Sequence, residues 1–325
     1  MRDRMPDRIV MPLSIRDKVK DLQLPTVTPH SALRTPHSFG LLAGWGRFPI
    51  VVAEALKRHG YRVCCLGIVG HADEAALSAI CDTYESIGIA KMGRQIRYFQ
   101  RHGVTDATMA GKIFKTWLFQ RGIWMRNFPD WTCLRTFFPH FITKTKKRND
   151  DALLLAVIEA YARGGITFAP ATNYAPELLV NTSHLGGPPL SFGQRKDIAF
   201  GFSLAKEMGR LDIGQSVAVK GQAVLAVEAV EGTDECIRRA GQLCPAGGFT
   251  VVKVAKPQQD MRFDVPTIGI GTLEVLAAAG GKVLAIESGK TIVIDREVVA
   301  AFAAKHRISV VAVDEASLRD GVEAA

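Results

Sequence analysis

The feature of this sequence that most constrains its fold is a regular alternation of short apolar runs with amphipathic stretches from residue 39 to residue 110. The apolar runs that predict strands are 39–43, 62–69, 84–89 and 106–110, and the stretches that predict helices are 49–59, 73–80 and 92–102. Strands and helices that alternate at this length form a mostly parallel sheet covered by helices on both faces. We therefore predict an α/β protein that begins with a Rossmann-like domain.

A glycine-containing turn follows the first predicted strand. It consists of Gly44, Trp45, Gly46 and Arg47, and the next helix begins at Pro49. A strand, a glycine turn and a helix in this order bring backbone N–H groups and a helix N-terminus toward a phosphate. Because Pro49 occupies the place of the third glycine of Gly-x-Gly-x-x-Gly, the turn predicts a nucleotide phosphate site more strongly than a nicotinamide site.

Gly111 and Lys112 directly follow the fourth predicted strand. Ligands of parallel sheets bind beyond the carboxyl ends of the strands, so we expect both residues to lie on the same edge as the glycine turn. Lys112 is a candidate phosphate contact, and the alternative is a solvated lysine at the start of a helix.

The second half of the chain concentrates its charge in residues 231–269. Carboxylates that hold a metal or orient a water, and cations that neutralise phosphate oxygens, are what a diphosphate site needs. The alternative is a pair of charged loops, in which Thr233 and Asp234 stabilise a helix start and Arg262 simply pairs with Asp264. The candidate residues of this stretch are Glu231, Thr233, Asp234, Lys256, Gln259, Arg262, Asp264 and Thr267.

Residues 113–148 interleave aromatic side chains with lysines and arginines, and Trp117, Trp124 and Trp131 recur every seven residues. This composition suits the interface of an anionic membrane or a pocket for acyl chains. Stacking on single-stranded nucleic acid is also compatible with it, but no fold known for that function accompanies it. Aromatic packing between domains is a further alternative.

Length and composition indicate an ordinary globular protein with an anionic partner. The chain has 325 residues, 47% hydrophobic content and a formal net charge of +9. We expect three parts, an extended arm at 1–37, a nucleotide-binding domain at 38–178 and an α/β domain at 179–325. No apolar run approaches the roughly 18 residues that span a bilayer and no signal peptide precedes the first strand, so we expect a cytoplasmic protein. The six scattered cysteines predict neither a disulfide nor a zinc site.

Several segments in order resemble the LpxI-type UDP-2,3-diacylglucosamine diphosphatases of lipid A biosynthesis. The matching segments lie at 42–49, 150–154, 211–234, 253–260 and 262–269, so that the resemblance covers roughly residues 38 to 315. Trp45 stands where this family usually carries glycine.

The resemblance implies hydrolysis of the diphosphate of UDP-2,3-diacylglucosamine to UMP and 2,3-diacylglucosamine 1-phosphate. It implies a UDP-binding first domain, a catalytic second domain, a Mg²⁺ site in which other divalent cations could serve, and a homodimer. It also implies peripheral attachment to the cytoplasmic face of the inner membrane, with no nucleic acid partner. On this basis we expect Asp264, Asp234 and Lys256 to be catalytic and Asp264, Asp234 and Glu231 to hold the metal.

Two other classes of function remain open on the sequence. The first is an NAD(P)-dependent oxidoreductase that uses the first domain. The second is a non-catalytic protein that binds a nucleotide sugar or a lipid.

Overall fold

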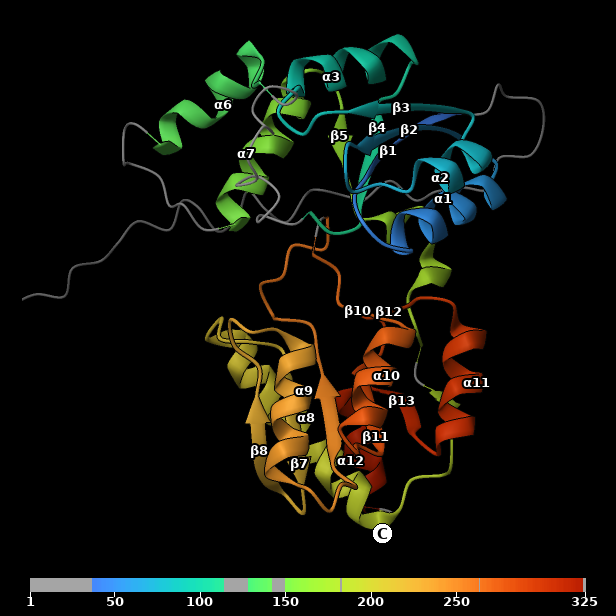
Figure 1. Ribbon diagram of the computed structural model, residues 1–325, viewed down its shortest axis with the longest axis vertical. Coiled ribbons are helices and arrows are strands. Elements are labelled where there is room, and N and C mark those ends of the chain that lie inside the picture. The colour runs from blue at the N-terminus through green and yellow to red at the C-terminus, as the bar shows by residue number, and fades with distance from the viewer. Residues whose placement is uncertain (1–36, 114–127, 142–149, 182, 263, 324–325) are drawn as a thin grey trace, which may run out of the picture. The chain divides into compact units, whose positions relative to one another are not determined.

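The structure is a computed structural model that describes residues 37–113, 128–141, 150–181, 183–262 and 264–323 (Figure 1). The predicted arm at 1–37 therefore lies almost entirely outside the described residues, as do most residues of the aromatic and basic segment.

The first sheet is parallel and has the order β3-β2-β1-β4-β5. Its strands are β1 (Ser38–Ala43), β2 (Arg62–Ile68), β3 (Thr83–Ile87), β4 (Asp106–Ala110) and β5 (Thr167–Phe168). The strands β1 and β2 are almost continuously buried, as expected for a parallel sheet covered on both faces. The predicted Rossmann-like parallel sheet is confirmed.

Helices pack on both faces of this sheet. They are α1 (Phe48–Arg58), α2 (Glu74–Ile80), α3 (Met92–Arg101) and α7 (Asp150–Arg163), whereas α6 (Trp131–Phe141) packs on α3 and α7. Leu41 is buried with α1 and α2, whereas the next residue, Leu42, is buried with α3 and α7. Successive strand residues point to opposite faces, so one apolar run supplies two cores.

The second sheet has six strands in the order β6-β13-β11-β9-β7-β8. The strands are β6 (Ser183–Gly186), β7 (Ser216–Lys220), β8 (Ala223–Val227), β9 (Thr250–Lys253), β11 (Val283–Glu287) and β13 (Ser309–Val313). β9, β11 and β13 run parallel, while β6, β7 and β8 pair antiparallel with their neighbours. β10 (Thr267–Ile268) and β12 (Ile292–Val293) form a separate parallel pair.

Residues 186–189 have the Gly- and Pro-rich composition of a linker or rigid loop, but Gly186 ends strand β6 of the second sheet. This edge strand is short and largely exposed, so it lacks the apolar alternation that identifies a strand.

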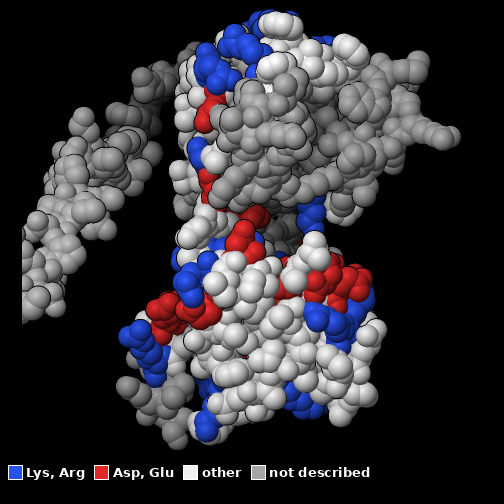
Figure 2. Space-filling model, turned by 90° about the vertical axis from the view of Figure 1, so that its left-hand side faces the viewer, with Lys and Arg blue, Asp and Glu red and all other residues white. Residues whose placement is uncertain are grey.

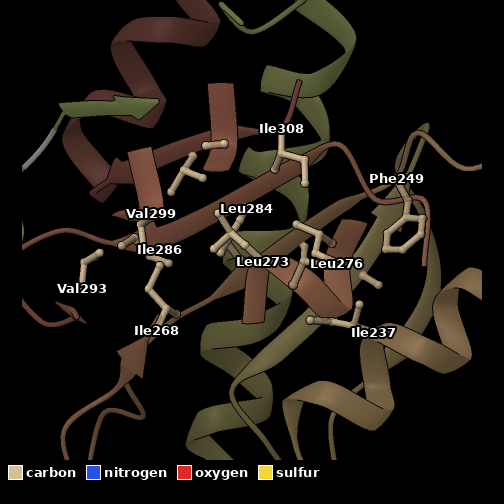
Figure 3. Close-up of a cluster of buried hydrophobic side chains, with 14 of the residues drawn as sticks. Ile237, Phe249, Ile268, Leu273, Leu276, Leu284, Ile286, Val293, Val299 and Ile308 are labelled. Carbon is tan, nitrogen blue, oxygen red and sulfur yellow. The ribbon is translucent and has the colours of Figure 1, made fainter. Parts of the chain in front are cut away.

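Helices cover both faces of the second sheet as well. They are α8 (Phe192–Arg210), α9 (Thr233–Leu243), α10 (Ile270–Ala278), α11 (Arg296–His306) and α12 (Glu315–Glu323). Figure 3 shows one core, in which Ile237 of α9 and Leu276 of α10 lie with Leu284 of β11. On the other face Phe202 of α8 is buried with Val252 of β9. The second α/β unit is thereby confirmed.

The segment that joins the two sheets contains the turns η1 (Ala171–Asn173) and η2 (Pro176–Leu178). Arg296 of α11 donates hydrogen bonds to the carbonyl oxygens of Glu177 and Leu179, at 2.6 and 2.7 Å. Ile292 of β12 is buried in the same cluster as Leu178 and Ile50. These contacts bind the joining segment to the second part of the chain.

Candidate functional site

The strand order of the first sheet reverses between β1 and β4, and such a reversal is where ligands of open parallel sheets bind. The loops that leave these two strands are bonded to each other. The Trp45 N–H donates to the Lys112 carbonyl at 2.8 Å, and the Lys112 N–H donates to the Trp45 carbonyl at 3.0 Å. The expectation that Gly111 and Lys112 lie beside the glycine turn is confirmed.

Glycine is required where these two loops meet. A Cβ on Gly44 would lie 2.7 Å from the carbonyl oxygen of Lys112. Gly111 has a φ of +93°, and a Cβ there would lie 2.8 Å from the carbonyl carbon of Gly44. The two loop backbones therefore lie close together at the switch point. The amino end of α1 follows directly after the first of these loops.

The side chains of this turn differ in their availability to a ligand. Trp45 is 51% exposed, so an indole stands at the switch point. Gly46 has a φ of +104° with nothing near its missing Cβ. Arg47 donates from Nε to Asp295 at 3.2 Å and also pairs with Glu54, so its cation is partly neutralised.

A second group of polar residues lies at the carboxyl edge of the second sheet, around Lys253 at the end of β9. This lysine is only 7% exposed, and burial lowers its pKa below the ordinary 10.5. Its Nζ donates to the carbonyl oxygen of Thr267 at 3.2 Å and to the hydroxyl of Thr233 at 3.4 Å. Within the described part of the chain no carboxylate is bonded to this ammonium, which makes its burial costly, and such cations concentrate at functional sites.

A buried carboxylate, that of Glu228, is linked to this lysine through the Thr233 hydroxyl. Glu228 follows β8, is 8% exposed and accepts a hydrogen bond from the Thr233 hydroxyl at 3.0 Å. Its other carboxylate oxygen is buried and has no hydrogen-bond partner among the described residues. The Thr233 hydroxyl thus links Lys253 to Glu228, and Ser216 at the start of β7 lies 3.3 Å from it.

Further charges act on Lys253. After burial, the charge of Glu228 raises its pKa and that of Lys112 lowers it, and Asp234 and Asp264 each raise it. Asp234 is exposed in the first turn of α9, and Asp264 is exposed between Asp260 and β10. Three predicted site residues, Lys112, Asp234 and Asp264, are therefore within electrostatic range of one buried cation.

The Thr233 prediction needs one correction. Thr233 had been considered as a possible N-cap, but the N-cap of α9 is Gly232, with a φ of 83°. The Thr233 hydroxyl is occupied by Glu228 and Lys253 instead. Thr267 supplies its carbonyl to Lys253, while its hydroxyl donates to the Val265 carbonyl at 2.9 Å.

Lys256 and Gln259 form a turn whose side chains are engaged. The Lys256 Nζ donates to Asp212 at 2.7 Å, and Asp212 is 75% exposed, so this ion pair can open to another anion. The side-chain oxygen of Gln259 accepts from the Lys256 N–H at 3.0 Å and closes the turn.

The structure does not gather all of the predicted residues. Arg262 donates from Nε to Asp260 at 2.9 Å, and this bond lowers the pKa of the Asp260 carboxyl. The cation of Arg262 is therefore held by Asp260, a partner that the sequence had not indicated. Glu231 pairs with Arg239 of α9, away from the contacts of Lys253.

The loop that carries Lys256 is held in place by the largely buried ion pair of Lys206 with Glu287. Glu287, at the carboxyl end of β11, accepts from the Ala255 N–H at 2.8 Å and from the Lys206 ammonium at 2.9 Å. The Lys206 ammonium also donates to the Ala255 carbonyl at 3.3 Å. Both backbone groups of Ala255 are thereby held, and the next residue, Lys256, is oriented through them.

Lys253 and Glu228 are the central residues that sequence reasoning did not select. A lysine after the apolar residues 249–252 is unusual at a buried strand end, and this was the signal available in the sequence. Glu228 gave no comparable signal, because a glutamate that directly follows an apolar strand is typical of an exposed strand end.

The donor set fits a divalent cation only in a limited way. Among the residues that the structure describes, no three His, Cys, Asp or Glu side chains are grouped to hold a metal ion. Mg²⁺ is usually bound through one or two carboxylates together with substrate phosphates. Asp234 and Asp264 are two exposed carboxylates that act on the same cation, and Glu231 pairs with Arg239.

The fold and the site define an α/β protein with two sheets. The first is a Rossmann-like parallel sheet, and the second is a mixed sheet with a buried lysine and several acids at the carboxyl ends of its parallel strands. The LpxI N-terminal domain matches residues 38–178, and the LpxI C-terminal domain matches residues 182–311. The chain belongs to the LpxI family.

A named relative extends this match. The chain is 31% identical over 284 residues to the UDP-2,3-diacylglucosamine pyrophosphatase LpxI of Caulobacter vibrioides. The aligned residues cover 85% of this chain and 97% of that protein. No helix within the described ranges is both long and apolar enough to cross a bilayer.

Proposed function

We propose that this protein hydrolyses the diphosphate of UDP-2,3-diacylglucosamine to UMP and 2,3-diacylglucosamine 1-phosphate, a step of lipid A biosynthesis. The observation that carries the proposal is the buried Lys253 at the carboxyl edge of the second sheet, with Asp234 and Asp264 in electrostatic range. Membership of the LpxI family and the name of the Caulobacter relative, a UDP-2,3-diacylglucosamine pyrophosphatase, support the choice of substrate.

The first sheet supplies the nucleotide grip in this proposal. The part of the turn that follows Trp45 and the amino end of α1 bind the uridine diphosphate, because N–H groups at a helix N-terminus suit phosphate oxygens, while Gly44 and Gly111 allow the two loops to lie close together. Trp45 offers an indole face to the uracil base. Lys112 contributes a cation to the same diphosphate, and its effect on the pKa of Lys253 supports this role.

The second sheet supplies the chemistry. A water oxygen attacks one phosphorus, the anhydride P–O bond breaks and negative charge builds on the departing phosphate. Lys253 and Lys256 neutralise that charge; the buried cation is the more effective because a low dielectric strengthens its field. Asp264 or Asp234 accepts the proton of the attacking water, and Thr233 with Glu228 holds the ammonium of Lys253 in place.

We also propose Mg²⁺ as the cofactor, with Asp234 and Asp264 as its protein ligands. When bound, the ion would polarise the phosphoryl oxygens and add positive charge at the diphosphate. Other divalent cations with oxygen ligands could replace it.

The reaction is tested by incubating the full chain with UDP-2,3-diacylglucosamine in mixed detergent micelles and measuring UMP. The proposal predicts UMP release that depends on Mg²⁺ and stops when a chelator is added. If the chain binds a nicotinamide cofactor in calorimetry and releases no UMP, the oxidoreductase alternative replaces it. Binding of the substrate without UMP release would favour the non-catalytic alternative.

Two further proposals concern the assembly. A diacylated substrate lies in a membrane, so we propose peripheral attachment to the cytoplasmic face of the inner membrane. Following the family resemblance, we propose a homodimer, which light scattering of the purified chain tests directly.

A further inference from the structure

Two loops at the carboxyl edge of the second sheet expose apolar side chains. Leu211 and Ile213, in the loop that precedes β7, are 59% and 48% exposed, and Val230, in the loop that follows β8, is fully exposed. We call these three residues the apolar rim. Single exposed apolar residues are ordinary on a protein surface, whereas a group of them beside a ligand site is typical of a binding surface.

The two loops lie against each other and against the candidate site. A Cβ on Gly214 would collide with the carbonyl group of Glu228, so only glycine permits this approach. The N–H of Glu228 donates to the carbonyl oxygen of Ser216 at 2.9 Å, and Ser216 pairs with Lys253 across the sheet. The apolar rim therefore belongs to the same edge as the buried lysine.

The first loop is held in one shape by its backbone. The N–H groups of Asp212 and Ile213 donate to carbonyl oxygens of the last turn of α8, both at 3.1 Å. The Gln215 carbonyl accepts from the Val254 N–H at 3.0 Å, and Asp212 adopts the left-handed region with a φ of 56°. Because the backbone is fixed, Leu211 and Ile213 stay exposed on either side of Asp212.

The apolar rim is interleaved with groups that contact the proposed phosphate-binding lysines. Asp212, between the two rim residues of the first loop, accepts from the Lys256 ammonium at 2.7 Å. Val230 is two residues after Glu228, which accepts from the Thr233 hydroxyl, and the buried lysine donates to the same hydroxyl. Each rim residue therefore lies within two residues of a group that is bonded to this cationic site.

Figure 2 shows the β8 side of the second sheet. Acidic and basic side chains gather there at the end of the sheet toward which β9 points in Figure 1, with uncharged side chains among them. Cations and exposed apolar side chains thus share one edge, which makes this edge complementary to an amphiphile that carries an anionic group.

We propose that the apolar rim binds the acyl chains of the diacylated sugar, while the neighbouring lysines bind its phosphate. A diacylglucosamine phosphate joins an anion and two apolar chains through one ring, and this edge presents a partner for each. Contact between the chains and the rim removes apolar surface of both from water. A stable interface between two copies usually buries at least roughly 1,000 Å², which three side chains do not supply. The inference rests on the proposed function, because the diacylated substrate comes from it.

The test is calorimetric binding of 2,3-diacylglucosamine 1-phosphate with short acyl chains, compared with glucosamine 1-phosphate, which has none. The full chain should bind the diacylated compound at least roughly tenfold more tightly. The variant L211S/I213S/V230S should lose at least roughly tenfold in affinity for the diacylated compound and keep its affinity for glucosamine 1-phosphate within about twofold. Leu243→Ser is the matched control, because it removes an apolar residue that is 61% exposed at the last position of α9, and both affinities should stay unchanged.

Two measurements accompany the binding assay. Circular dichroism checks the fold of the triple variant, and Val230→Ser alone, with an expected loss of roughly threefold, replaces it if it fails to fold. UMP release from UDP-2,3-diacylglucosamine is measured on the full chain. Rim-dependent binding of the diacylated compound without UMP release would support the inference while refuting the proposed hydrolysis, so the two failures are distinguishable.

Three results would overturn the inference. One is equal affinity of the full chain and the triple variant for the diacylated compound. Another is an equal loss of affinity for both compounds, which would mean that the two loops serve the phosphate alone. The third is loss of a dimer in light scattering with binding intact, which would make the apolar rim an interface between two copies of the chain.

Discussion

Replacing Lys253 with methionine separates a catalytic role of this residue from a structural one. Burial holds the pKa of Lys253 below 10.5, so its charge is a net cost in the folded state, by about 1.4 kcal/mol for each unit of lowering. Methionine removes that cost but also two hydrogen bonds of about 1 kcal/mol each. The two terms oppose each other, so the free energy of unfolding should fall by no more than the roughly 2 kcal/mol that the two hydrogen bonds contribute.

Turnover should change much more. Removing one preorganised group that stabilises developing charge typically lowers kcat by roughly 10²–10³-fold, which corresponds to about 3–4 kcal/mol. The assay is UMP release at saturating substrate, with denaturant unfolding measured on the same preparations. Lys282→Met is the matched control, because this lysine is exposed at the amino end of β11, on the opposite edge of the sheet, and should leave kcat unchanged.

The stability measurement also has a predicted pH dependence. The folded-state pKa of Lys253 is below the unfolded one, so the cost of the charged lysine is full at pH values below the folded-state pKa and is relieved as pH rises through it toward 10.5. Any advantage of the methionine variant should shrink over that interval. An unchanged kcat, or a loss of activity that only follows the unfolded fraction, would refute the reasoning.

Three other substitutions test the neighbourhood of the site. Glu228→Gln removes a charge that raises the pKa of the buried lysine, so the alkaline limb of the kcat–pH profile should move to lower pH; an unmoved limb would contradict this. Glu287→Gln weakens the support of the loop before Lys256, and KM should rise several-fold with the fold retained in circular dichroism. Gly111→Ala should cost about 1–3 kcal/mol in unfolding and weaken UDP binding in calorimetry, whereas Gly60→Ala, with open space around its Cβ, should cost less and leave UDP binding unchanged.

Much of the fold follows from patterns that burial enforces. β1 and β2 are apolar throughout because helices cover both of their faces, and this made the parallel sheet predictable. β6 escaped prediction because an exposed edge strand of four residues has no burial pattern to read. The pair β10 and β12 has two residues per strand, too few for any period.

The site was predictable in its location more than in its partners. The glycine turn and Gly111 were found because a switch point and a positive φ both impose residue types. Which acid meets which cation depends on loop geometry that sequence does not encode locally. Arg47 pairs with Asp295, which is 248 residues away in the sequence. Arg262 pairs with Asp260, whereas the sequence suggested Asp264.

The central claim is that acids at the carboxyl edge of the second sheet act on the diphosphate. It is tested most directly by the kcat of UMP release for Asp234→Asn beside that of Glu235→Gln. Both acids are exposed in the first turn of α9, but the charge of Asp234 acts on Lys253, while Glu235 pairs with Arg238. The account predicts a loss of roughly 10²-fold or more for the first variant and an unchanged kcat for the second. Equal turnover by both variants and the unchanged chain would contradict it.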